Sequence, residues 1–87
     1  MEELEELFLQ EKPARILVGI NHGDDAKYAS VLSKEADCTY SHTVKILDKF
    51  KEHDLVEFRK EGRKKLIDLT DRGETIAEKL DSLISVL

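Results

Sequence analysis

A change in hydrophobic period near residue 54 is the feature that most constrains the fold. Before it, apolar residues recur at helical spacing. After it, Val56 and Phe58 alternate with charged residues, as in a half-buried strand, and residues 67–69 show the same alternation. Residues 60–63, Lys-Glu-Gly-Arg, separate the two runs and are typical of a hairpin tip. The pattern therefore predicts a β-hairpin over about residues 55–69, set among helices.

Four helices are predicted before the hairpin and one after it. The first covers residues 2–10, Pro13 lies in the first turn of the second, and Asp24 or Asp25 caps the third, which contains Ala26. Thr39 and Thr70 are suitable N-caps for the fourth helix and the last. In the fourth helix we expect Val44, Ile46, Leu47 and Phe50 to point inward.

Two short helices joined by a tight turn and followed at once by a basic hairpin make a winged helix-turn-helix. We therefore expect a mainly α fold with a small β-hairpin and with flanking N- and C-terminal helices. The length of 87 residues predicts one domain over residues 1–87. Within it we expect the helix-turn-helix at about 25–53, the wing at about 55–69 and the C-terminal helix at about 70–87.

The stretch LVEFRKEGRKKLIDLTDRG resembles the wing signature of MarR-type transcriptional regulators. The positions that carry the resemblance are Glu61, Arg63, Ile67, Leu69, Thr70 and Gly73. Upstream, TYSHTVKILDKFKEHDLV is similar to the recognition helix of that family and its exit into the wing, as in small archaeal members. Glu61 stands where the family usually has Asp, and the flanking helices are short. The resemblance therefore implies DNA binding more firmly than it implies sensing of a small molecule.

The charge distribution favours the same function, although the net charge is −5. Residues 1–37 carry a net charge of −5, residues 38–67 carry +3, and residues 68–87 carry −3. A basic middle third between acidic flanks can present one cationic face to the phosphates of DNA.

The candidate DNA contacts lie in two groups. On the outer face of the fourth helix and at its start they are Thr39, Tyr40, Ser41, His42, Lys45 and Lys49. On the wing they are Arg59, Lys60, Arg63, Lys64 and Lys65. The alternatives are a plain N-cap at Thr39, a solvated helix face at Lys45 and Lys49, and wing lysines that only guard an exposed strand edge.

A homodimer is expected because the last helix carries more apolar surface than one small core can cover. The predicted interface comprises Ile76, Leu80, Leu83, Ile84 and Leu87, joined by Leu4, Leu7 and Phe8 from the N-terminus.

We expect no cofactor, no metal and no enzymatic activity, because no catalytic or ligand constellation is visible. Cys38 and His42 are two candidate ligands where a metal needs three or four, and the single Cys is expected to be a small buried residue in the turn. One Cys, an acidic N-terminus and no long apolar run indicate a cytoplasmic protein with no membrane partner.

The sequence thus predicts sequence-specific binding of double-stranded DNA by a transcriptional regulator. The alternative is a winged-helix module for protein–protein contact, whose basic wing would meet an acidic partner; the overall acidity favours it.

Overall fold

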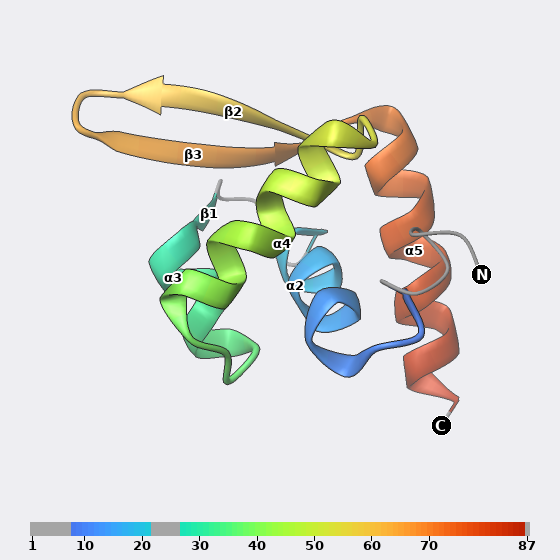
Figure 1. Cartoon of the computed structure of the whole chain (residues 1–87). Coiled ribbons are helices and arrows are strands. Elements are labelled where there is room, and N and C mark those ends of the chain that lie inside the picture. The colour runs from blue at the N-terminus through green and yellow to red at the C-terminus, as the bar shows by residue number, and fades with distance from the viewer. Residues whose placement is uncertain (1–7, 22–26, 87) are drawn as a thin grey trace.

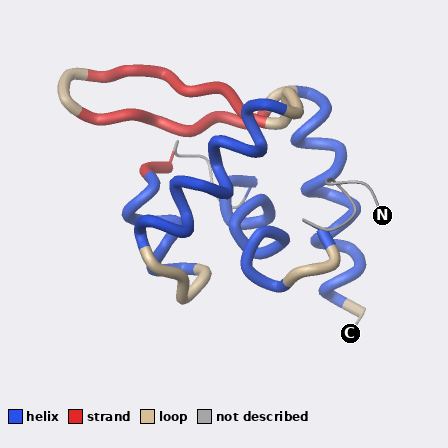
Figure 2. Tube along the Cα trace, in the orientation of Figure 1, coloured by secondary structure: helices blue, strands red, loops and turns tan. Residues whose placement is uncertain are grey.

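The computed structural model describes residues 8–21 and 27–86 (Figure 1). The elements in chain order are α2 (Glu11–Asn21), β1 (Lys27–Tyr28), α3 (Ala29–Glu35), α4 (Tyr40–Glu52), β2 (Val56–Glu61), β3 (Lys64–Leu69) and α5 (Asp71–Ser85). Helices α2 to α5 form the body, and the β2–β3 hairpin extends away from it past α4 (Figures 1 and 2). This is the predicted fold class, a mainly helical winged helix-turn-helix. The helix expected over residues 2–10 lies largely outside the described residues.

Two predicted N-caps are confirmed. The Thr39 hydroxyl accepts a hydrogen bond from the backbone N–H of His42 at 3.2 Å, and the Thr70 hydroxyl accepts one from the N–H of Gly73 at 3.0 Å. Each satisfies a backbone donor that the first turn of a helix leaves unpaired. The Thr70 hydroxyl also donates to the carbonyl of Asp54 at 2.7 Å, so this cap ties the start of α5 to the entry of the wing.

The predicted start of the third helix was wrong. Helix α3 begins only at Ala29, because Lys27 and Tyr28 form strand β1, which pairs antiparallel with β3. The central strand of the sheet is therefore β3, in the order β1-β3-β2. A strand of two residues is too short for alternation to reveal it. The proposed caps, Asp24 and Asp25, lie outside the described residues, as does Ala26.

The hairpin turn is tighter than predicted. Lys60 and Glu61 belong to β2, and only Gly62 and Arg63 form the turn. Gly62 has a φ of +64°, which suits the first position of a two-residue hairpin turn and which residues with a Cβ rarely adopt. Across the turn Glu61 is opposite Lys64, a pair of opposite charges.

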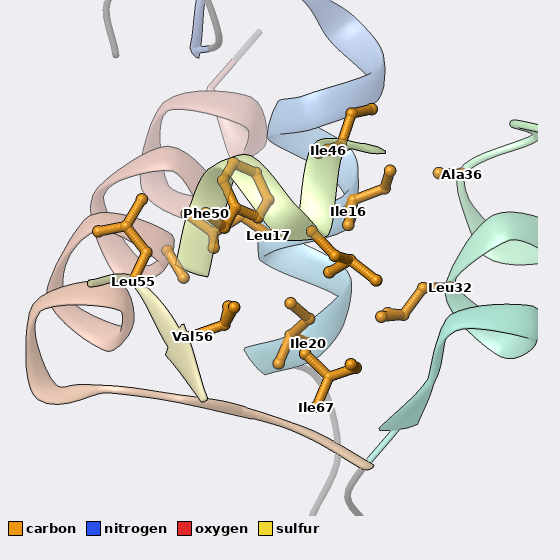
Figure 3. Close-up of a cluster of buried hydrophobic side chains, with 12 residues drawn as sticks. Ile16, Leu17, Ile20, Leu32, Ala36, Ile46, Phe50, Leu55, Val56 and Ile67 are labelled. Carbon is orange, nitrogen blue, oxygen red and sulfur yellow. The ribbon is translucent and has the colours of Figure 1, made fainter. Parts of the chain in front are cut away.

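The core lies between the four helices and the inner end of the sheet, with α2 packed against α3, α4, α5 and β3. Its side chains converge from all of these elements (Figure 3). Of the α4 residues expected inside, Ile46, Leu47 and Phe50 are buried, whereas Val44 is only half-buried. Thr43 is buried instead, since its hydroxyl donates to the Thr39 carbonyl at 2.9 Å and so needs no water.

Within the described residues, no helix is long and apolar enough to cross a membrane.

Candidate nucleic-acid interface

Helix α4 is anchored by one face and exposed on the other. The buried face carries Thr43, Ile46, Leu47 and Phe50, of which none is more than 2 % exposed. The residues of the predicted helix contact group, Thr39, Tyr40, Ser41, His42, Lys45 and Lys49, are all exposed. They form a single strip on the outer side of α4, with Tyr40 60 % exposed at its N-terminal end. The helix can therefore carry polar contacts on this strip without disturbing the core.

The turn before α4 is held by a lysine from another helix. The Lys12 ammonium group of α2 donates to the carbonyl of Ala36 at 3.0 Å and to that of Asp37 at 2.6 Å. These carbonyls follow the last residue of α3, where a helix leaves its acceptors unpaired. Asp37 itself has a φ of +51°, so the chain reverses sharply there. Lys12 thereby fixes where the first turn of α4 points, and sequence reasoning missed it because the contact spans 24 and 25 residues.

The five predicted wing cations are exposed but do not share one environment. Arg59 forms an ion pair with Asp68, with Nε and Oδ2 3.2 Å apart. The Lys64 ammonium lies 4.9 Å from the centre of the Tyr28 ring, and that of Lys65 lies 4.6 Å from the centre of the Phe58 ring. In the described structure Lys60 and Arg63 have no ion-pair partner. The wing cations with neither an ion-pair partner nor a ring contact in the described structure are therefore Arg63, in the hairpin turn, and Lys60, near the end of β2.

A cleft of about 280 Å³ opens between α4 and the hairpin. Its lining includes Tyr28 and Tyr40, the half-buried Val44 and Phe58, and Lys65. The cleft thus separates the exposed strip of α4 from the wing, and both predicted contact groups contribute to its walls.

The residues of the predicted dimer interface fall into two sets. Phe8, Ile76 and Leu80 pack against the core of their own chain, and the Phe8 ring stacks on that of Phe50 with 6.1 Å between centroids. Leu83 is 54 % exposed and Ile84 is half-buried. Leu4, Leu7 and Leu87 lie outside the described residues. Two apolar side chains not singled out from the sequence, Leu9 and Val86, are 74 % and 79 % exposed.

Cys38 is half-buried in the turn between α3 and α4 and packs against the core. Among residues 8–21 and 27–86, no group of three or more His, Cys, Asp or Glu side chains could hold a metal ion.

Several solved structures share this arrangement. The crystal structure of AF1382 from Archaeoglobus fulgidus is 33% identical, with a TM-score of 0.82 over 98% of this chain and 96% of that one. SPO1453, a MarR family transcriptional regulator from Silicibacter pomeroyi, is 24% identical, with a TM-score of 0.78 over 95% and 60% of the two chains. A variant of MepR from Staphylococcus aureus, bound to an oligodeoxyribonucleotide, is 21% identical, with a TM-score of 0.79 over 94% and 62%.

At these identities the last two comparisons show a shared fold, and this chain spans about three-fifths of each of those proteins. The family model for the winged helix DNA-binding domain matches residues 9–73. That match covers the helix-turn-helix, the whole wing and the first turn of α5. The chain therefore belongs to the family of winged helix DNA-binding domains, and its fold is that of the MarR-like regulators.

Proposed function

We propose that this protein binds double-stranded DNA sequence-specifically, as a homodimeric transcriptional regulator. The observation that carries the proposal is the exposed polar strip of α4, anchored from behind by a buried face and flanked by a protruding basic wing. A helix of this kind fits the major groove, where base edges carry a distinct pattern of donors and acceptors.

Ser41, His42 and Lys45 are the proposed base readers, because they lie in the first two turns of α4 and are exposed. A serine hydroxyl and a neutral imidazole can donate or accept, and an ammonium group can reach the acceptors of guanine. Tyr40 is proposed to lie along the sugar–phosphate backbone, since its side chain is exposed. The Thr39 hydroxyl already accepts from His42, so its role is to cap the helix, while the free amides beside it suit a phosphate. Lys49 extends the strip toward the next phosphate.

The wing is proposed to supply affinity more than sequence choice. Arg63 occupies the hairpin turn next to Gly62, where a long cation can enter the minor groove. Lys60 and Lys65 are exposed and are proposed to meet phosphates. Arg59 contributes less, because an acid already engages its charge. Lys64 and Lys65 each lie over one aromatic ring and both are exposed to a phosphate.

Dimerisation is supported by the exposed apolar side chains near the end of α5, Leu83 and Val86. A two-fold dimer would present two copies of α4 about one turn of DNA apart, roughly 34 Å. Sedimentation equilibrium at tens of micromolar tests this, and a monomer with and without DNA would contradict it.

The test of specificity begins with selection of bound duplexes from a random library. Affinity for the selected duplex and for a scrambled one is then measured by fluorescence anisotropy over a range of salt concentrations. We expect tighter binding to the selected duplex and a steep loss of affinity with salt on both. His42→Ala and Lys45→Ala should each reduce the preference by about 1–3 kcal/mol, whereas Lys79→Ala on the exposed side of α5 should not.

Two results would overturn this proposal. Unchanged discrimination in both α4 variants would mean that α4 does not read bases. Absence of salt-dependent duplex binding in the parent would favour the alternative, a module whose basic wing docks on an acidic protein.

A further inference from the structure

The register of the hairpin divides the wing into two faces of different charge. Residues directly opposite each other in an antiparallel pair share a face, and every second residue of a strand returns to it. The inner face, which continues into the core, comprises Val56, Phe58, Lys60, Lys65, Ile67 and Leu69. The outer face comprises Glu57, Arg59, Glu61, Lys64, Leu66 and Asp68.

The outer face carries charges of both signs, and the inner face carries only positive ones. On the outer face Arg59 pairs with Asp68 and Glu61 is opposite Lys64, while Glu57 is a second acid directly opposite Asp68. On the inner face the ionisable residues are both lysines, Lys60 and Lys65, and they are directly opposite each other. Like charges at directly opposed positions destabilise a β-hairpin. The fold therefore gains nothing from this pair.

A third lysine approaches the same place from helix α4. The Lys51 ammonium lies 5.4 Å from the centre of the Phe58 ring, and the Lys65 ammonium lies 4.6 Å from the same centre. Two nitrogens at these distances from one point are separated by at most about one Debye length, roughly 10 Å in 0.1 M salt, so their repulsion is not fully screened. In the described part of the chain, no carboxylate forms an ion pair with Lys51, Lys60 or Lys65.

We propose that Lys51, Lys60 and Lys65 form a subsite for one phosphodiester group of bound nucleic acid, at the junction of helix α4 and the wing. The Phe58 ring keeps two of the three ammonium groups in place through their attraction to its π-face. A phosphate bound beside them supplies an opposite charge, which no carboxylate of the described chain supplies through an ion pair. The inference rests on the proposed function for the source of the phosphate, and it adds Lys51 to the interface.

The test compares Lys51→Gln with Lys79→Gln, a matched loss of one exposed lysine charge on α5, outside the interface. Glutamine has nearly the same helix propensity as lysine, so both variants keep their helices. The affinity of each variant for a 20-base-pair duplex is measured against salt concentration. We expect Lys51→Gln to reduce the slope of log K against log salt by about 0.9, the contribution of one phosphate, and Lys79→Gln to leave it unchanged.

A second measurement needs no DNA. Inorganic phosphate is added at constant ionic strength, with chloride as the reference anion, and the melting temperature is recorded. Phosphate stabilises folded proteins relative to chloride even without a site, because it is excluded from their surface. We therefore expect phosphate to raise the melting temperature of the parent and of Lys79→Gln by more than that of a Lys51→Gln, Lys65→Gln double variant. A purely structural role of the lysines would give the same rise in all three proteins.

The outcomes separate this inference from the proposed function. If the parent binds duplex with a steep salt slope but Lys51→Gln has the same slope, DNA binding stands and the subsite is wrong. Equal losses in Lys51→Gln and Lys79→Gln would reduce the effect to net charge and also refute the subsite. A phosphate effect without any duplex binding would overturn nucleic acid as the source and point to an acidic or phosphorylated protein.

Discussion

Gly73, at the start of α5, is a residue at which adding a single methyl group should lower the free energy of unfolding markedly. It is the third residue of the helix and is buried. A Cβ added there would be 1.9 Å from the carbonyl oxygen of Leu55 and 2.9 Å from its carbonyl carbon. That oxygen also accepts the hydrogen bond from the N–H of Thr70 at 3.0 Å. A methyl group at residue 73 must therefore push α5 away from the entry of the wing.

The expected cost of Gly73→Ala follows from three terms. Overpacking against backbone costs about 1–3 kcal/mol, and loss of the hydrogen bond between Thr70 and Leu55 adds about 1 kcal/mol or more. Alanine returns roughly 1 kcal/mol through its higher helix propensity. We expect the free energy of unfolding to fall by about 1–3 kcal/mol. For a domain of this size that corresponds to a melting temperature lower by about 5–25 °C.

Gly19→Ala is the matched control, because it makes the same chemical change at a buried position in the last turn of α2. A Cβ there would meet Leu32 Cδ2 at 3.5 Å and Glu35 Oε2 at 3.9 Å, which is ordinary contact. We expect Gly19→Ala to raise the free energy of unfolding by about 0.5–1 kcal/mol. Urea unfolding followed by circular dichroism measures both variants. A Gly73→Ala protein as stable as the parent, or equal losses in both variants, would refute the reasoning.

Three further predictions concern residues that position the proposed DNA-binding surface or lie on it. Lys12→Met should lower the free energy of unfolding in urea by about 1 kcal/mol, because it leaves the Ala36 and Asp37 carbonyls without their donor. Arg15→Met removes only a surface ion pair and should stay within about 0.5 kcal/mol of the parent. Equal effects of the two substitutions would contradict a special role for Lys12. Thr39→Ala should cost about 1 kcal/mol through loss of its cap, and Thr39→Ser should restore most of it; a neutral alanine variant would mean that water replaces the cap. Arg63→Ala should weaken binding to two unrelated duplexes and flatten the salt slope by about 0.9 without changing the melting temperature; unchanged affinity on both would remove the wing tip from the interface.

Local patterns in the sequence were sufficient where a short segment specifies its own structure. The alternation around Val56 and Phe58 predicted the hairpin, and Thr39 and Thr70 were identified as caps from residue type and position alone. A helix cap is a hydrogen bond between residues three apart, and strand alternation repeats every two residues. Both depend only on residues that are close in the sequence, so the sequence is sufficient to predict them. The same holds for the exposed strip of α4, because helical spacing separates its two faces.

The fold decided what depends on contacts between distant segments. Strand β1 forms because its backbone pairs with the edge of β3, and the two residues Lys27 and Tyr28 do not by themselves indicate a strand. Val44 is only half-buried because it lines the cleft between α4 and the wing. Thr43 is buried because its hydroxyl donates a hydrogen bond to the Thr39 carbonyl.

Sequence by itself determined that this chain has helices, a hairpin, their caps and a basic middle third, since these follow from neighbouring residues. Only the tertiary structure decided which cations are already engaged and which converge. Arg59 and Lys60 are adjacent in the chain, yet the register places one beside Asp68 and the other opposite Lys65. Lys51 approaches Phe58 only because α4 packs beside the sheet. Charge is a property of each residue, but its compensation depends on partners that folding brings near.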